Sequence, residues 1–221
     1  MASSNPSQSG TGFNPDCVLC PRIASHLDSV RKAHPHYHAG PVAPFGESNP
    51  DLLIVGLGPG MHGANATGRP FTGDYAGILL YQTLYDYGFS NLPESKHQDD
   101  GLELKKCRIT NAVKCLPPEN KPKGEEVRTC NPYLRTELDA IPGKLVVLAL
   151  GKIAHDATLR ALDLKQKDHP FSHNATHSLT EQRWLVDSYH CSRYNTQTRR
   201  LTTAMFRDVF DNILKLLNLT N

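Results

Sequence analysis

The stretch Leu52–Asp74, LLIVGLGPGMHGANATGRPFTGD, indicates the fold class. Its first residues, Leu52 to Val55, form a short apolar run that is typical of a buried parallel strand. The strand leads into a loop rich in glycine, asparagine and threonine, and ligands of open α/β sheets bind at this carboxyl end of a strand. Glycine lets the backbone approach a ligand closely. The loop is too long and too polar for a simple connector, so we interpret it as a binding site rather than as an irregular surface loop.

The glycines of this loop fit neither of two common phosphate-binding loops. A dinucleotide-binding loop needs a third glycine where Met61 stands, and Pro59 obstructs the start of the helix that would follow. A P-loop ends in Gly-Lys followed by Ser or Thr, and that ending is absent. The loop therefore belongs to a different class of site.

The rest of the chain alternates between segments that predict strands and segments that predict helices. Strands are expected at 52–56, 107–113, 145–150 and 183–187, and helices after Pro21 and at 75–87, 125–141, 152–162 and 202–217. Pro132 should disturb the helix in which it lies. The alternation predicts an α/β fold whose parallel sheet is covered on both faces, with the loops after its strands gathered at one edge. Helix 75–87 offers these residues for packing: Ile78, Leu79, Leu84 and Tyr85.

Length and composition describe an ordinary globular protein. The chain has 221 residues, enough for one sizeable domain, and a net charge of +2 that does not by itself indicate a nucleic-acid binder. Residues 1–13 are rich in Ser, Gly, Asn and Pro and are expected to be a disordered tail, with a single domain over 14–221. With no export signal or membrane-spanning run visible, we expect a cytoplasmic monomer.

Local charge is more informative than net charge. Between Ser188 and Arg207 the chain has no acidic residue and carries four arginines: Arg193, Arg199, Arg200 and Arg207. Such a patch suits phosphates, although a solvated surface is an equally good interpretation from charge alone.

Four of the six cysteines have the spacing of a metal site. Cys17 and Cys20 form a CxxC pair, and Cys115 and Cys130 follow far downstream. Four thiolates select an iron–sulfur cluster or zinc, and the spacing does not separate the two. Cys107 lies in a strand pattern and is expected to be a small buried residue.

Three separate motifs resemble those of the uracil-DNA glycosylase superfamily. The segment 62–74, HGANATGRPFTGD, has the form of motif one of the B-type, or family 5, enzymes. The segment 114–130, from KCLPPENKP to its final cysteine, is similar to the cluster-binding segment of families 4 and 5. His190, followed by Ser192 and Asn195, resembles motif two, a DNA-inserting loop; Cys191 and Arg199 stand where the family often has Pro and Gly.

The resemblance implies a fold, a cofactor and an activity. The fold is a three-layer α/β/α sandwich with a central four-stranded parallel sheet. The cofactor is a structural [4Fe-4S] cluster, and the activity is excision of uracil, with hypoxanthine and other deaminated bases as further substrates, from DNA whose damaged nucleotide is flipped into a pocket. The ligands carried over to this chain are Cys17, Cys20, Cys115 and Cys130.

The resemblance also implies roles in the base pocket. Phe71 stacks on the flipped base, and Asn111 reads the pyrimidine edge, because an amide both donates and accepts hydrogen bonds. Asn111 as a strand-end cap is the alternative, and Asn120 is a second candidate for base reading. His190 donates a hydrogen bond to the charge that develops on the leaving base.

The water nucleophile needs a polar partner. Gly58 stands in the base pocket where the superfamily often has an Asp or Asn, so the resemblance assigns the water to Asn65. Asp74 is the alternative carboxylate, but an Asp just before a helix is often only an N-cap, and we favour that interpretation.

The remaining implied roles concern DNA, and a DNA substrate makes nucleoid association the expectation for this chain. Arg193 and Tyr194 are candidates for the wedge that fills the vacated stack, and His62 contacts the base or a phosphate. The residues expected to grip phosphates are Ser192, Arg199 and Arg200.

Two other classes of function remain open. A non-catalytic iron–sulfur protein that binds damaged DNA would explain why Gly58 replaces the usual polar residue. A relative that links covalently to the abasic sugar through a histidine would need a different motif one and an extra loop.

Overall fold

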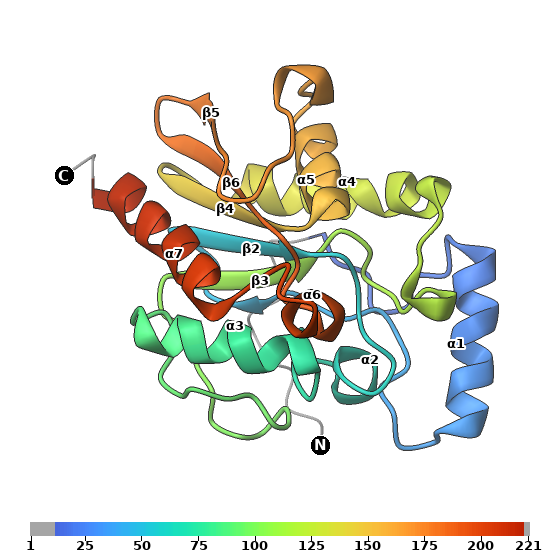
Figure 1. Cartoon of the computed structure of the whole chain (residues 1–221). Coiled ribbons are helices and arrows are strands. Elements are labelled where there is room, and N and C mark those ends of the chain that lie inside the picture. The colour runs from blue at the N-terminus through green and yellow to red at the C-terminus, as the bar shows by residue number, and fades with distance from the viewer. Residues whose placement is uncertain (1–11, 219–221) are drawn as a thin grey trace.

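The computed structural model describes residues 12–218, so most of the tail expected to be disordered lies outside the described residues. A six-stranded sheet runs through the middle of the molecule in the order β1-β3-β2-β4-β6-β5 (Figure 1). The four central strands are parallel: β3 (Cys107–Asn111), β2 (Leu52–Gly56), β4 (Leu145–Leu150) and β6 (Arg183–Ser188). The predicted four-stranded parallel sheet is confirmed.

Two short antiparallel strands extend this sheet and were not predicted. They are β1 (Phe45–Gly46), which pairs with β3, and β5 (Thr176–Thr180), which pairs with β6. Neither has an apolar run, because an edge strand buries little: the side chains of β5 alternate between exposed and partly buried.

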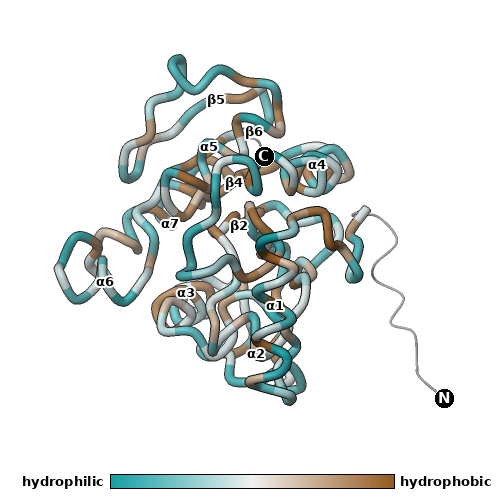
Figure 2. The backbone as a smooth tube through the Cα atoms, turned by 90° about the vertical axis from the view of Figure 1, so that its right-hand side faces the viewer, coloured by the Kyte–Doolittle hydropathy of each residue, from teal (hydrophilic) through white to brown (hydrophobic). Residues whose placement is uncertain are grey.

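Helices cover both faces of the sheet, as the fold class requires. On one face, α3 (Tyr75–Asp86) and α7 (Thr203–Asn218) pack against Leu52 and Ile54 of β2. On the other, α4 (Gly124–Ala140) and α5 (Lys152–Ala161) pack against Leu53 and Val55. Successive strand residues point to opposite faces, so the apolar side chains of β2 pack into the hydrophobic cores on both faces of the sheet. Figure 2 shows hydrophobic stretches along the central strands and hydrophilic ones on the outer loops.

The remaining helices and turns lie in the connections before and between these elements. They are α1 (Pro21–Ala33), α2 (Ala64–Thr67), α6 (Arg193–Gln197) and the single 3₁₀ turns η2 (Pro118–Asn120) and η3 (Gln166–Asp168). Helix α1 packs on the loop after β3, which joins the N-terminal segment to the body of the domain. None of the helices among residues 12–218 is both long and apolar enough to cross a membrane.

Two local predictions are wrong. Pro132 lies inside α4 without interrupting it. In α3 the expected packing residues Ile78 and Tyr85 are exposed, while Leu80 and Tyr81 are buried. The helix is rotated because Gly77 faces inward: a β-carbon there would lie 2.0 Å from the carbonyl oxygen of Phe71, so only glycine lets the loop and the helix approach so closely.

Candidate active site and metal centre

The loops after β2, β3, β4 and β6 meet at one edge of the sheet, as predicted for the loops that follow the strands. They enclose a cavity of about 580 Å³, which is within the usual range for small-ligand sites. The predicted site residues that line it are Gly58, Phe71, Asn111, His190, Ser192 and Arg193. Asp74 and Asn120 line it too, and so does the start of α5.

Two ring side chains form part of the wall. The ring centroids of Phe71 and His190 are 6.0 Å apart with planes inclined by 25°. Phe71 has a φ of 57°, which is uncommon for a bulky residue and costs backbone energy, as is frequent at functional sites. Gly56 makes this arrangement possible, because a β-carbon there would lie 2.4 Å from Asn111 Oδ1 and 2.8 Å from the Phe71 ring.

Asn111 supplies an unused acceptor. Its side chain is 3% exposed, and its Oδ1 has no hydrogen-bond partner among the described residues. A buried polar atom without a partner is costly, so such atoms in native proteins usually indicate a ligand or a functional role. If Asn111 capped the end of the strand through this oxygen, Oδ1 would accept a hydrogen bond, and it accepts none from the described residues.

His190 is a neutral imidazole at physiological pH. Burial lowers the pKa of His190 to about 4, and its Nδ1 has no partner among the described residues. Asn195 Nδ2 donates to the backbone carbonyl of His190 at 2.8 Å, and this hydrogen bond holds the loop after β6 in place. A neutral ring can donate one N–H hydrogen bond to an anion that forms in the cavity.

Asp74 does not cap α3, so the favoured interpretation of this residue is wrong. It stands before α3, but its side chain makes no bond to that helix; its Oδ2 accepts from the amide of Ala64 at 3.2 Å instead. The carboxylate packs against Gly60 and Gly63, where β-carbons would lie 2.5 Å and 1.9 Å from Oδ1. Burial raises the pKa of this carboxyl above its usual range.

Asn65 and His62 lie outside the cavity. Asn65 is fully buried within the loop, where its Nδ2 donates to the carbonyl of Met61 at 3.4 Å. His62 is exposed, and its Nδ1 lies 2.8 Å from the hydroxyl of Tyr37. The structure therefore brings Asp74, rather than either of these residues, to the cavity.

The arginines expected to contact DNA are exposed on and around α6, which stands out from the body of the molecule (Figure 2). The Arg193 guanidinium lies 5.7 Å from the ring centroid of Tyr75, and Arg200 lies 4.7 Å from that of Tyr189. Tyr194 is 71% exposed at the tip of the helix. Ser192 caps α6 by accepting from the amide of Asn195.

The fourth arginine of this patch is already paired. Arg207 forms an ion pair with Asp86, whereas Arg193, Arg199 and Arg200 form none with any acidic group between residues 12 and 218. These three side chains are the ones left with charge available for phosphates.

The sequence did not predict the buried polar contacts that hold the motif-one loop in place. Arg69 is 4% exposed; its Nη2 donates to Ser95 Oγ and to Asp100 Oδ2, both at 2.6 Å, and its Nε donates to Thr72 Oγ1 at 2.8 Å. Asp100 is 31 residues away in the chain, so no local pattern signals this ion pair.

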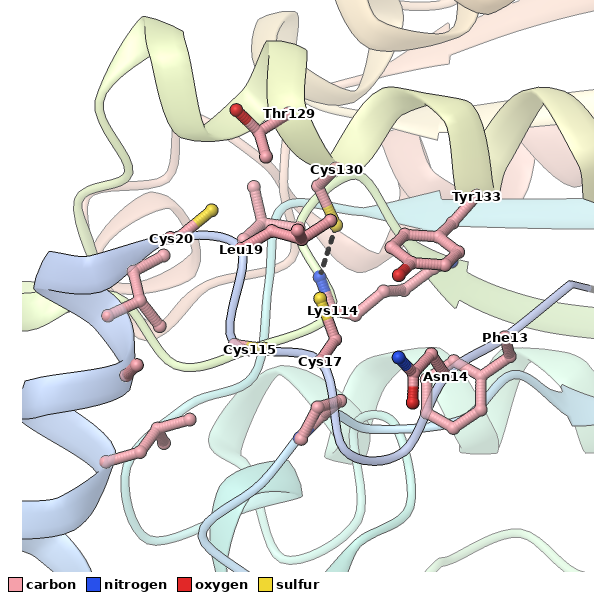
Figure 3. A pocket seen from close by; sticks show the side chains of 15 residues that line it. Phe13, Asn14, Cys17, Leu19, Cys20, Lys114, Cys115, Thr129, Cys130 and Tyr133 are labelled. Atoms are coloured by element: carbon pink, nitrogen blue, oxygen red, sulfur yellow. Dashed lines mark hydrogen bonds between the residues drawn. The ribbon is translucent and has the colours of Figure 1, made fainter.

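The four cysteines of the predicted metal site line one pocket. Figure 3 shows the side chains of Cys17, Cys20, Cys115 and Cys130, from three separate segments, around this hollow. Burial and the neighbouring thiols raise the pKa of Cys20 to about 11 and of Cys115 to about 12. Thiols so disposed ionise together only with a positive centre among them, so the donor set fits a metal or a cluster.

Backbone chemistry around this pocket supports the same assignment. The amide of Lys114 donates to Cys130 Sγ at 3.3 Å, and such a hydrogen bond stabilises a thiolate that binds a metal. Cys107 and Cys191 are buried in the core on the α3 side of the sheet, which confirms the structural interpretation of Cys107.

Comparisons with known proteins agree with this geometry. Residues 43–214 match the family model described as the uracil DNA glycosylase superfamily. A type-5 uracil-DNA glycosylase of Thermus thermophilus is 46% identical over 87% of this chain and 90% of its own length. Similar proteins of the same name occur in Pyrobaculum aerophilum, at 39% identity over 88% of this chain and 86% of that protein, and in Mycobacterium leprae, at 40% over 90% and 91%.

Proposed function

Because this chain belongs to family 5 of the uracil-DNA glycosylase superfamily, we propose that it is a monofunctional DNA glycosylase that removes uracil and leaves an abasic site. The observation that carries the proposal is the cavity in which a stacking ring, an unsatisfied buried amide and a neutral imidazole face one space. Hypoxanthine and other deaminated bases are further proposed substrates. One chain supplies every group of this site, so the proposed enzyme acts as a monomer on chromosomal DNA.

The cavity suits a flipped pyrimidine. A glycosylase must take the nucleotide out of the stack before it can reach the glycosidic bond. In the proposed complex the base stacks on Phe71, and the Asn111 amide pairs with its Watson–Crick edge through the oxygen that is unpartnered in the free protein. Asn120 lines the same cavity and is the second amide available for the base.

His190 and Asp74 divide the chemistry. As the glycosidic bond breaks, negative charge develops on the base, and the N–H of the neutral His190 donates to it. The sugar becomes cationic, and the Asp74 carboxylate stabilises that charge and orients the water that attacks. In this proposal Asp74 takes the role that the resemblance assigned to Asn65, which shapes the loop from its buried position.

The exposed residues of α6 and its flanks hold the DNA. Arg193 and Tyr194 fill the space left by the flipped nucleotide, and Ser192, Arg199 and Arg200 contact phosphates. His62, exposed beside Tyr37, is placed for a phosphate rather than for the base.

The proposed cofactor is a [4Fe-4S] cluster on Cys17, Cys20, Cys115 and Cys130. When bound, it supplies a structural cross-link. The segment 111–120 carries Asn111 and Asn120 at the base pocket and Cys115 between them, so the cross-link would hold both amides in place.

Replacing a cluster ligand should remove the metal. We expect Cys115→Ser to lose bound iron and sulfide, and to lower the free energy of unfolding by several kcal/mol, because folding energy is coupled to the metal. Elemental analysis and visible absorption of anaerobically purified protein measure the loss. Cys107→Ala, which changes a thiol in the core, should keep wild-type iron. Stoichiometric zinc without iron in the wild type would contradict the cluster.

The proposed activity is tested with purified protein and duplexes that contain uracil, hypoxanthine or only normal bases, followed by alkali to cleave abasic sites. Strand cleavage that depends on uracil supports the glycosylase. Binding of the damaged duplexes without cleavage would instead support the non-catalytic damage-binding protein, the alternative raised by Gly58.

Arg199 offers a separate test of the DNA surface. Its φ is 57°, in the region that favours glycine, so Arg199→Gly should stabilise the fold by about 0.5–1 kcal/mol. The same change should weaken DNA binding and make the slope of log K against log salt shallower by about one. Thermal unfolding and binding titrations at several salt concentrations measure both effects. Arg199→Ala should weaken binding equally without the gain in stability; unchanged binding in both variants would contradict the phosphate contact.

A further inference from the structure

A buried polar cluster lies next to the strand that carries His190. It consists of His155 on α5, His177 on β5 and Asp187 on β6. Asp187 Oδ1 lies 2.7 Å from His155 Nδ1, and Asp187 Oδ2 lies 3.1 Å from His177 Nε2. The side chains of His155 and Asp187 are 1% and 0% exposed, so this is a costly arrangement for which the proposed chemistry has no direct use.

The hydrogen-bond partners of His155 define its protonation state. Its Nδ1 faces the carboxylate of Asp187, and its Nε2 faces the backbone carbonyl of His169 at 2.9 Å. When Asp187 is ionised, both partners are acceptors, and a proton on each ring nitrogen completes the two bonds. His155 is then an imidazolium ion, and Asp187 is the carboxylate that balances it.

A metal ion is the competing occupant, since two histidines and a carboxylate are common ligands. Two ligands of one tetrahedral zinc ion, each about 2.0–2.1 Å from it, lie about 3.3 Å apart. The 2.7 Å between Asp187 Oδ1 and His155 Nδ1 is a hydrogen-bond distance instead. The spacing therefore favours a shared proton over a metal.

This pair joins two walls of the active-site cavity. Asp187 lies three residues before His190 along β6 and its exit. His155 lies in the first turn of α5, whose preceding residue Gly151 lines the cavity and donates its amide to the carbonyl of Ser188 at 2.8 Å. A β-carbon at Gly151 would lie 3.6 Å from His190 Cβ, an ordinary van der Waals distance, so the residue that precedes α5 lies beside the His190 side chain.

A second contact from the same side supports the exit of β6. The amide of Tyr189, the residue before His190, donates to His173 Nδ1 at 3.2 Å. His173 belongs to the segment between η3 and β5, which also supplies the His169 carbonyl. The segment 169–177 thus contacts β6 on both sides of Ser188, close to His190.

We propose that the buried Asp187–His155 pair is a positioning device that sets His190 against the flipped base. The proposal rests on the proposed glycosylase activity, in which His190 donates to the leaving base. Neither residue of the pair lines the cavity, so both act through His190.

The test compares Asp187→Asn with the wild type. Misplacement of a catalytic group by about 1 Å costs up to roughly 10²-fold in rate, so we expect a 10–100-fold slower single-turnover excision of uracil. The Kd for uracil-containing duplex should change less than about twofold, because α6 and its arginines are untouched. Asp163→Asn is the matched control: it makes the same substitution in the exposed Arg135–Asp163 ion pair, which does not line the cavity, and it should excise at the wild-type rate.

A spectroscopic measurement tests the protonation state without any variant. In wild-type protein labelled with ¹⁵N-histidine, both ring nitrogens of His155 should show the shifts of protonated nitrogen at neutral pH. A neutral His155 overturns the proposal, and so does stoichiometric zinc that is lost in His177→Gln. Because it uses wild-type protein, this measurement still tests the Asp187–His155 pair if Asp187→Asn fails to fold.

Different results would overturn the glycosylase activity and the positioning role of the Asp187–His155 pair. A wild-type protein without uracil excision overturns the proposed function and removes the premise of this inference. An active wild type with an equally active, folded Asp187→Asn overturns the positioning role alone.

Discussion

Replacing His190 by alanine should lower the single-turnover rate of uracil excision by about 10²–10³-fold, the usual cost of removing one donor to a developing anion. The donor works in a cavity that excludes much of the water, where a hydrogen bond to an anion is stronger than in solution. Burial keeps the imidazole neutral, with a pKa of about 4, so the ring gains a negatively charged partner only as the bond breaks. The interaction therefore stabilises the transition state more than the bound substrate.

The effect of His190→Ala should be confined to the chemical step. DNA affinity of His190→Ala should stay within about twofold of wild type, since phosphate contacts dominate affinity. His97→Ala is the matched control, because it removes an exposed histidine that neither lines the cavity nor is proposed to contact DNA. The wild-type rate should show no inflection from His190 between about pH 6 and 8, where an unperturbed histidine titrates. Equal rates for His190→Ala and wild type would remove His190 from the mechanism.

The convergence of the site loops was predictable from the sequence for a geometric reason. Apolar runs at 52–55 and 145–150 are legible as buried parallel strands, and the carboxyl ends of parallel strands share an edge. Asn111 is the last residue of β3 and His190 follows β6, so their meeting with Phe71 at this edge follows from the topology. The edge strands were missed because β1 has two residues and the inward face of β5 is only partly buried, which leaves a weak hydrophobic pattern.

Features that depend on distant partners could not be predicted. Local sequence makes Asp74 an ordinary N-cap, and only the packing of Gly60 and Gly63 against its carboxylate shows that it faces the motif-one loop instead. The buried Arg69–Asp100 pair and the Asp187–His155 pair join segments 31 and 32 residues apart. Such pairs leave no mark on hydrophobic periodicity, and they are the contacts that determine the orientation of the site loops.

The second large effect should come from Asp74. We expect Asp74→Asn to lower the excision rate by about 10²-fold or more, because an amide cannot take up the proton of water or balance a cationic sugar. The substitution keeps the size of the side chain and an oxygen that can accept from the amide of Ala64, so the fold should be retained. Single-turnover rates and thermal unfolding of the variant separate these two effects.

The pH dependence of the rate distinguishes Asp74 from Asn65. The active form of Asp74 is the carboxylate, so the wild-type rate should fall as the pH is lowered through the pKa of this group. Because burial raises that pKa, the fall begins at a higher pH than for an ordinary aspartate, and Asp74→Asn should lack it. Asn65→Ala empties a fully buried site and should lower stability while keeping most of the excision rate. The opposite result would assign the water to Asn65 instead. In that case Asn65→Ala would lose excision, while Asp74→Asn would keep both the excision rate and its fall at low pH.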